Sequence, residues 1–175
     1  KPVRTADANK IEVAEVFWYG CPHCFNFEPL FGEFKTTLAD DVNVVEIPAV
    51  FSKIHESHAK LYYIAKFMKV EKQARMAIYK EIMAKRGRAL TDVDSQVEFL
   101  ASYGIDEAKY RKMYDSFYVN NLINMAKSKI IGYQVTGTPD VIVNGKYRIE
   151  GFKSQQERLE IAKFLVEKER AEKAN

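Results

Sequence analysis

Two cysteines separated by two residues are the part of this sequence best suited to chemistry. Cys21 and Cys24 are the only cysteines of the chain, and they flank Pro22 and His23 in the run Cys-Pro-His-Cys. Two sulfurs this close in sequence can form and break a disulfide with each other, but they cannot staple a long loop of chain. The pair is therefore a redox site, half of a metal site, or an inert local disulfide.

The position of the pair predicts a stabilised thiolate at Cys21. Pro22 suits the first turn of a helix, where its missing N–H costs nothing, so a helix is predicted to begin here with Cys21 at its cap. The unpaired N–H groups and partial positive charge of a helix N-terminus favour a negatively charged sulfur. His23 can add a positive charge or a hydrogen bond beside it, whereas Cys24, one turn further on, is expected to be more buried. Because a stabilised thiolate stabilises the reduced form, the disulfide is predicted to be an oxidant rather than a reductant.

Zinc binding is the main alternative to redox chemistry. His55 and His58 could complete a set of two cysteines and two histidines, but a long stretch of chain separates them from Cys24. The sequence also lacks the second Cys-x-x-Cys that many zinc sites use. We prefer the redox pair and expect neither a metal nor another cofactor, with the zinc site and the inert disulfide as alternatives.

The composition is typical of a folded protein and argues against several other classes. Hydrophobic residues make up 47% of the 175 residues and charged residues 29%, unlike disordered chains. The net charge of +3 gives no electrostatic case for nucleic acid, and the one dense basic stretch, residues 85–88, is interpreted as a solvated loop. No apolar run reaches the ~20 residues that span a bilayer. The chain opens with Lys1 and Pro2 and contains no signal peptide, which fits the mature form of an exported protein.

The elements around the cysteines predict a parallel strand–helix–strand unit. Residues 13–19 are apolar and aromatic except for one acid, which predicts a strand buried on both faces and ended by Gly20. The helix that follows extends to about residue 38, with a kink at Pro29. A second strand is predicted over residues 42–47, and so short a crossover implies that the two strands are parallel.

The middle of the chain is predicted to be helical, and its end returns to strands. Residues 52–131 have room for four or five helices, one of which is predicted to begin at the capping sequence Thr91-x-x-Asp94. Residues 141–149 predict two strands joined by a type I′ turn at Asn144-Gly145, and a final helix follows.

This order of elements predicts an α/β fold interrupted by an insertion. Residues 1–52 and 132–175 are expected to form one domain, and residues 53–131 an inserted, all-helical subdomain.

A second chemical signal is Thr138-Pro139, directly before the predicted hairpin. Proline cannot donate to a strand ladder, so its presence at a strand entrance needs a reason. A cis peptide bond after Thr138 is one reason, and a trans proline in a turn is the other.

Together these features resemble the DsbA family of thiol oxidases, within the thioredoxin superfamily. The resemblance is carried by Phe-Trp-Tyr-Gly-Cys-Pro-His-Cys-Phe at residues 17–25, by Thr138-Pro139 with the hairpin after it, and by the helical block. It implies a thioredoxin-like fold with an inserted helical subdomain, a cis bond before Pro139, and contact of Thr138 and Pro139 with the substrate backbone.

The resemblance also implies an activity, partners and a compartment. The protein would be a periplasmic, monomeric oxidase that passes the Cys21–Cys24 disulfide to unfolded, cysteine-containing secreted proteins. A DsbB-type membrane partner linked to quinone would reoxidise it, and no cofactor would be needed. A reductase or isomerase of the same family is the nearest alternative, and a metal-binding structural module is the alternative from another class.

Two acidic residues near the cysteines are further candidates. The family places acids near the buried cysteine, where they relay protons or tune its pKa, and Glu15 and Glu28 occupy such positions here. Glu28 could equally lie on a solvated helix face, whereas Glu15 interrupts a buried strand, where an unpaired carboxylate is costly. Family members often place a basic residue against this acid, but the position predicted opposite Glu15 holds Glu46. Either the register is shifted by one residue, or two carboxylates share a proton.

Overall fold

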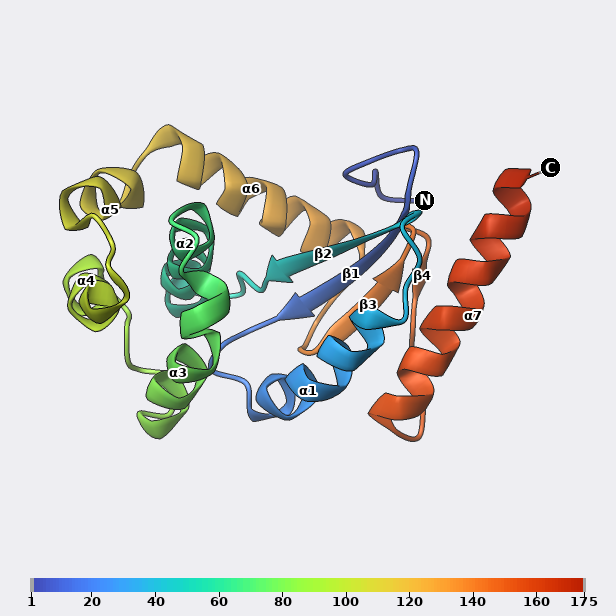
Figure 1. Ribbon diagram of the computed structural model, residues 1–175, viewed down its shortest axis with the longest axis horizontal. Helices are drawn as coiled ribbons and strands as arrows, with labels where there is room; N and C mark the ends of the chain where they lie inside the picture. Colours follow the sequence, from blue (N-terminus) through green and yellow to red (C-terminus); the bar gives the residue numbers. More distant parts are fainter. Residues whose placement is uncertain (1, 175) are drawn as a thin grey trace.

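The centre of the molecule is a four-stranded sheet with the strand order β2-β1-β3-β4. The computed structural model describes residues 2–174 (Figure 1). The first two strands, β1 (Ile11–Phe17) and β2 (Val42–Pro48), are parallel, as predicted. The other two, β3 (Asp140–Val143) and β4 (Tyr147–Arg148), form an antiparallel hairpin, with β3 beside β1.

Helices cover both faces of this sheet. On one face, α1 (Pro22–Thr36) and α7 (Gln155–Ala174) pack against β1 and β3 through one apolar core. On the other face, α6 (Phe117–Gly132) packs against the remaining side chains of the same strands. Because β1 is covered on both sides, all of its residues are buried, as the sequence predicted.

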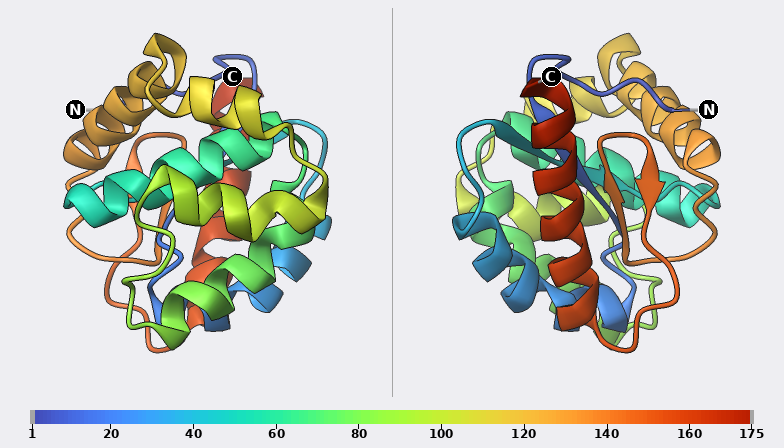
Figure 2. Two further views of the ribbon diagram at one scale, coloured as in Figure 1. Left: turned by 90° about the vertical axis from the view of Figure 1, so that its left-hand side faces the viewer. Right: turned by 90° about the vertical axis from the view of Figure 1, so that its right-hand side faces the viewer.

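The remaining helices form a block beyond the end of β1 (Figures 1 and 2). They are α2 (Lys53–Phe67), α3 (Glu71–Ala84), α4 (Val93–Leu100) and α5 (Glu107–Tyr114), with a 3-10 turn at Ala101–Tyr103. Their shared core also takes in both cysteines, so the block packs directly against the candidate redox site. Within the described range, no helix combines the length and apolar character needed to cross a membrane.

Three local predictions can be compared with the structure. The first strand ends at Phe17 rather than residue 19, because the Cys21 N–H donates to the Trp18 carbonyl in a turn. The helix predicted to start at Thr91 is instead capped by Asp92, whose carboxylate accepts from the Ser95 N–H at 2.9 Å. The type I′ turn is confirmed, since Asn144 and Gly145 have φ of 51° and 65°.

Candidate redox site

Cys21 is the N-cap of α1, and Pro22 is the first residue of that helix, as predicted. The turn that ends β1 therefore places the Cys21 sulfur over the unpaired N–H groups of the first helical turn. Cys21 keeps 8% of its surface exposed, whereas Cys24 is fully buried. Both are free thiols in this structure, and Cys21 is the more accessible of the two to an incoming group.

The surroundings of the two cysteines shift their pKa values in opposite directions. A hydrogen bond from the Cys24 thiol lowers the pKa of Cys21 to about 5 against the opposing effect of burial, with help from the Thr138 side chain and the N–H groups of His23 and Cys24. Burial raises the pKa of Cys24, and its contact with the Cys21 sulfur raises it further. The site therefore supports one thiolate and one thiol.

The peptide bond between Thr138 and Pro139 is cis. The loop before β3 lies against the cysteines, with the Thr138 carbonyl oxygen 3.3 Å from the Cys21 sulfur, where it accepts from the protonated thiol. Residues more than a hundred positions apart in sequence thus meet at one sulfur, as the resemblance implied.

The three histidines have different surroundings. His23 is exposed beside Cys21 and contributes its backbone N–H to the low pKa of that thiol. His58 accepts from the Trp18 indole at 2.9 Å and bonds the Ala89 carbonyl at 2.8 Å, so both of its ring nitrogens are occupied. His55 stacks on the same Trp18 ring. Among residues 2–174, no three His, Cys, Asp or Glu side chains gather closely enough to hold a metal ion.

Glu15 is a buried carboxyl group, and neither of its oxygens has a hydrogen-bond partner among residues 2–174. Burial, together with the nearby negative charge of Glu28, raises its pKa to about 8. The register places Glu46 directly opposite Glu15, so the predicted pairing of the two strands is correct. Glu46 does not share a proton with Glu15, however, because it forms ion pairs with Lys35 and Arg75.

The cation absent from the strand position comes from α3. Arg75 forms two hydrogen bonds with the carboxylate of Glu28 and a third with Glu71. Tyr79 also donates to Glu28, at 3.0 Å. Glu28 therefore does not lie on a solvated helix face, since its side chain is only 11% exposed and is paired on the inner side of α1.

The sequence did not indicate Arg75, Glu71 or Tyr79 as part of the site. They lie in the helical block, where the periodicity marks only which face of α3 is buried. The one signal available was the presence of charged residues among the apolar positions of that face, since buried charges need partners.

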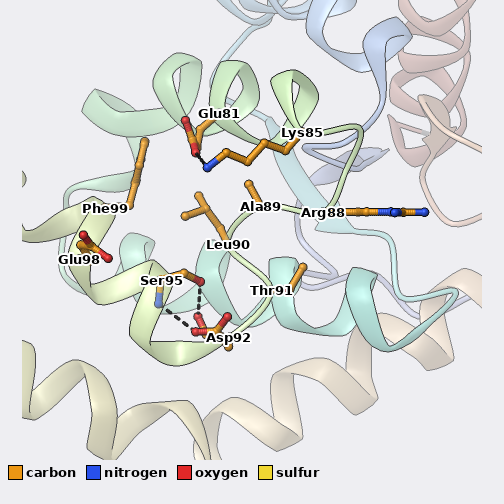
Figure 3. Close-up of a pocket in the computed structure, with 10 residues that line it drawn as sticks. All are labelled: Glu81, Lys85, Arg88, Ala89, Leu90, Thr91, Asp92, Ser95, Glu98 and Phe99. Carbon is orange, nitrogen blue, oxygen red and sulfur yellow. Dashed lines mark hydrogen bonds and ion pairs between the residues drawn. The ribbon is translucent and has the colours of Figure 1, made fainter.

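A separate hollow of about 430 Å³ lies between α3 and α4 (Figure 3). Its lining mixes both charges, and two of the acidic groups are already engaged: Glu81 pairs with Lys85, and Asp92 caps α4. Neither cysteine lines it, so it is distinct from the redox site.

A family model and the sequences of known proteins both assign this chain to the same family. The model of the DSBA-like thioredoxin domain matches residues 40–161, a range that begins after the cysteines and so does not depend on them. The thiol:disulfide interchange protein DsbA of Pseudomonas aeruginosa is 38% identical over 172 residues, which cover 97% of this chain and 81% of that protein. The protein of the same name from Azotobacter vinelandii is 39% identical over 171 residues, with coverages of 97% and 79%.

Solved structures agree with this assignment. The crystal structure of Pseudomonas aeruginosa DsbA matches with a TM-score of 0.93 at 37% identity, covering 100% of this chain and 92% of that one. The DsbA structure from Xylella fastidiosa matches with a TM-score of 0.85 at 30% identity, with coverages of 94% and 88%. The chain thus has the thioredoxin fold with a helical insertion, and it belongs to the DsbA family of thiol:disulfide interchange proteins, which are oxidoreductases.

Proposed function

We propose that this protein is a disulfide oxidase that works through Cys21 and Cys24 on unfolded, cysteine-containing proteins exported to the periplasm. The observation that carries the proposal is the position of Cys21 at the cap of α1, where the Cys24 thiol and the N–H groups of the first turn lower its pKa to about 5. A thiolate that is stable at neutral pH stabilises the reduced protein, and a disulfide whose reduced form is stable gives up its bond readily.

The reaction consists of two exchanges. A substrate thiolate attacks the Cys21 sulfur of the Cys21–Cys24 disulfide, forms a mixed disulfide and releases Cys24, which takes up a proton because its pKa is raised. A second substrate thiolate then attacks the substrate sulfur of the mixed disulfide and releases the Cys21 thiolate. The substrate loses two electrons and the protein gains them. A DsbB-type, quinone-linked membrane oxidase then removes these electrons and restores the disulfide.

Neighbouring groups have distinct parts in this scheme. The cis-Pro139 loop receives the substrate backbone beside Cys21, with Thr138 against the sulfur. Glu15 is the proton reservoir for the buried cysteine, since an unpartnered carboxyl with a pKa of about 8 carries a proton at neutral pH. Glu28 raises that pKa by its negative charge. His23 is exposed, and it takes part through its backbone N–H, which helps to lower the pKa of Cys21.

We also propose the domain division at the sequence positions given above, with residues 53–131 as the insertion. The supporting observation is that α2 to α5 share one core beyond the end of β1, whereas α1 and α7 share another on the sheet. The last helix of the insertion, α6, joins the first of these cores through Val119 and Ile123, and its second half packs on the sheet. The chain is proposed to act as a monomer.

Oxidative refolding of a reduced, multi-cysteine protein tests the activity. The oxidised protein should supply disulfides stoichiometrically, and Cys21→Ser should supply none. Absence of disulfide transfer by the intact protein would refute the proposal.

Equilibration with a glutathione buffer separates an oxidase from a reductase or isomerase. We expect the Cys21–Cys24 disulfide to be reduced at low ratios of reduced to oxidised glutathione. A disulfide that stays intact in strongly reducing buffer would instead assign the protein to reduction.

A further inference from the structure

The two carbonyl groups around the cis-proline face different partners. The Thr138 carbonyl accepts from the Cys21 thiol at 3.3 Å. The next carbonyl, that of Pro139, accepts from Nη1 of Arg158 at 2.6 Å. A guanidinium on α7 therefore holds the loop one residue away from its contact with the reactive sulfur.

The Arg158 side chain is buried and is contacted by an aromatic ring and a carboxylate. It is only 6% exposed, its guanidinium lies 4.0 Å from the centroid of the Phe152 ring, and Nη2 pairs with Asp140 Oδ1 at 3.4 Å. Its Nε has no hydrogen-bond partner in the described part of the chain. A buried guanidinium with an unpaired N–H contributes little to stability. The burial of Arg158 is therefore better explained by a role in the site than by stabilisation of the fold.

Asp140 is shared between two arginines, and only one of them reaches the Pro139 carbonyl. Arg148 on β4 donates to Asp140 Oδ2 at 2.6 Å and to the Gln134 carbonyl at 2.8 Å, and it forms an ion pair with Glu150. Arg158 makes the weaker pair with Asp140, and its second contact is the Pro139 carbonyl. The two arginines thus share an acidic partner, and they differ in whether they hold the carbonyl of Pro139.

We propose that Arg158 is a positioning residue for disulfide exchange: by holding the Pro139 carbonyl, it fixes the loop that presents Thr138 to Cys21 and to the backbone of an incoming substrate. This inference rests on the proposed function. Its basis is that a charge-assisted hydrogen bond to a carbonyl is short and directional, and so restrains the peptide to which it is made.

A substrate with a peptide backbone should need this restraint more than a small thiol does. The probes are a reduced single-cysteine peptide, which can pair with the loop, and 2-mercaptoethanol, which has no backbone. The rate of mixed-disulfide formation is measured for the oxidised protein, for Arg158→Met and for Arg148→Met, after thermal unfolding has established that each is folded.

Arg158→Met should lower the rate with the peptide by about tenfold, as expected for loss of a hydrogen bond to a charged group, and leave the rate with 2-mercaptoethanol within about threefold. Arg148→Met should leave both rates within about threefold, because it removes a partner of Asp140 without touching Pro139. An unchanged peptide rate in Arg158→Met would overturn the proposal. So would an equal loss with both thiols, or an equal loss of the peptide rate in Arg148→Met.

If Arg158→Met does not fold, Arg158→Lys provides the test. Lysine keeps the charge but lacks the planar fork that reaches Pro139 and Asp140 together, so the peptide rate should fall by at least about threefold. A wild-type peptide rate in that variant would overturn the proposal. Failure of the intact protein to oxidise a refolding protein, with the peptide rates as expected, would refute the proposed function and leave the role of Arg158 standing.

Discussion

The Arg75 guanidinium on α3 donates two hydrogen bonds, of 2.8 and 2.7 Å, to the Glu28 carboxylate on α1. This is the planar, two-point geometry that arginine forms with carboxylates. Glu28 lies one helical turn beyond Cys24, so the contact links the helical block to the helix that carries the cysteines. The carboxylates of Glu28, Glu46 and Glu71 are therefore held by a residue that is not part of the sheet or its covering helices.

Replacing Arg75 should be costly. Arg75→Met leaves Glu28, Glu71 and Glu46 without their shared cation, so we expect a loss of about 3–5 kcal/mol in the free energy of unfolding. Urea unfolding of the oxidised protein measures it. The control is Lys85→Met, which breaks an exposed pair with Glu81 and should leave the urea midpoint almost unchanged. Equal midpoints for the two variants would show that the Arg75 pairs do not stabilise the fold.

The Cys21 thiolate should be visible by titration of the reduced protein. We expect one rise in absorbance at 240 nm with a midpoint near pH 5, because the pKa of Cys21 is lowered to about 5 from an ordinary value of 9.0. Cys24 should remain a thiol over this range, since its pKa is raised. Cys21→Ser should remove the transition.

The same shift predicts the pH dependence of stability. A lowered pKa adds stability that is fully present above the ordinary pKa and is lost as the pH falls through the folded value. The reduced protein should therefore gain stability from pH 5 to pH 9 relative to Cys21→Ser. A thiolate midpoint near 9 would contradict both expectations and the oxidase assignment.

The hairpin after Pro139 is held by the N-terminal segment at Gly145. The Val3 N–H donates to the Gly145 carbonyl at 2.8 Å, and a Cβ on Gly145 would lie 2.0 Å from the Val3 oxygen. Gly151 has a similar positive φ but open space around it. Gly151→Ala should thus cost only the backbone strain, about 1 kcal/mol, whereas Gly145→Ala should cost more. Thermal unfolding compares the two variants. Equal losses of stability would show that the N-terminal segment moves away from residue 145 at no cost.

The sequence was informative where chemistry is local. The place of the cysteine pair at a helix start, the parallel register of Glu15 and Glu46, and the Asn144-Gly145 turn all depend on neighbouring residues or on alternation along a strand. The cis bond at Pro139 was reached only through the resemblance, because a trans turn accounts for the same residues.

The charged partners could not be predicted in this way. Arg75 and Arg158 act across 47 and 19 positions of sequence, and periodicity says that a position is buried but not which carboxylate or carbonyl it meets. The start of α4 was missed for a different reason. Thr91 and Asp92 are both good caps, and the choice between them follows from the loop, in which Leu90 has a φ of 54°.

The protonation of Glu15 can be tested through stability. In the folded protein its pKa is raised to about 8 from 4.5, so between these pH values the folded state holds a proton that the unfolded state has lost. The free energy of unfolding must therefore fall as the pH rises through this window, and the whole of this loss is reached above pH 8. Glu15→Gln has no proton to lose and should lack this fall.

We expect the free energy of unfolding of Glu15→Gln, relative to the intact protein, to improve by about 3 kcal/mol or more between pH 5 and pH 9, since each pKa unit corresponds to about 1.4 kcal/mol. Urea unfolding of the oxidised forms avoids titration of the cysteines. Any cost of burying the glutamine amide is the same at both pH values and cancels in the comparison. Glu33→Gln, on the exposed side of α1, is the matched control and should show no such change. If Glu15→Gln follows the control, Glu15 is ionised throughout and cannot supply the proton that Cys24 takes up.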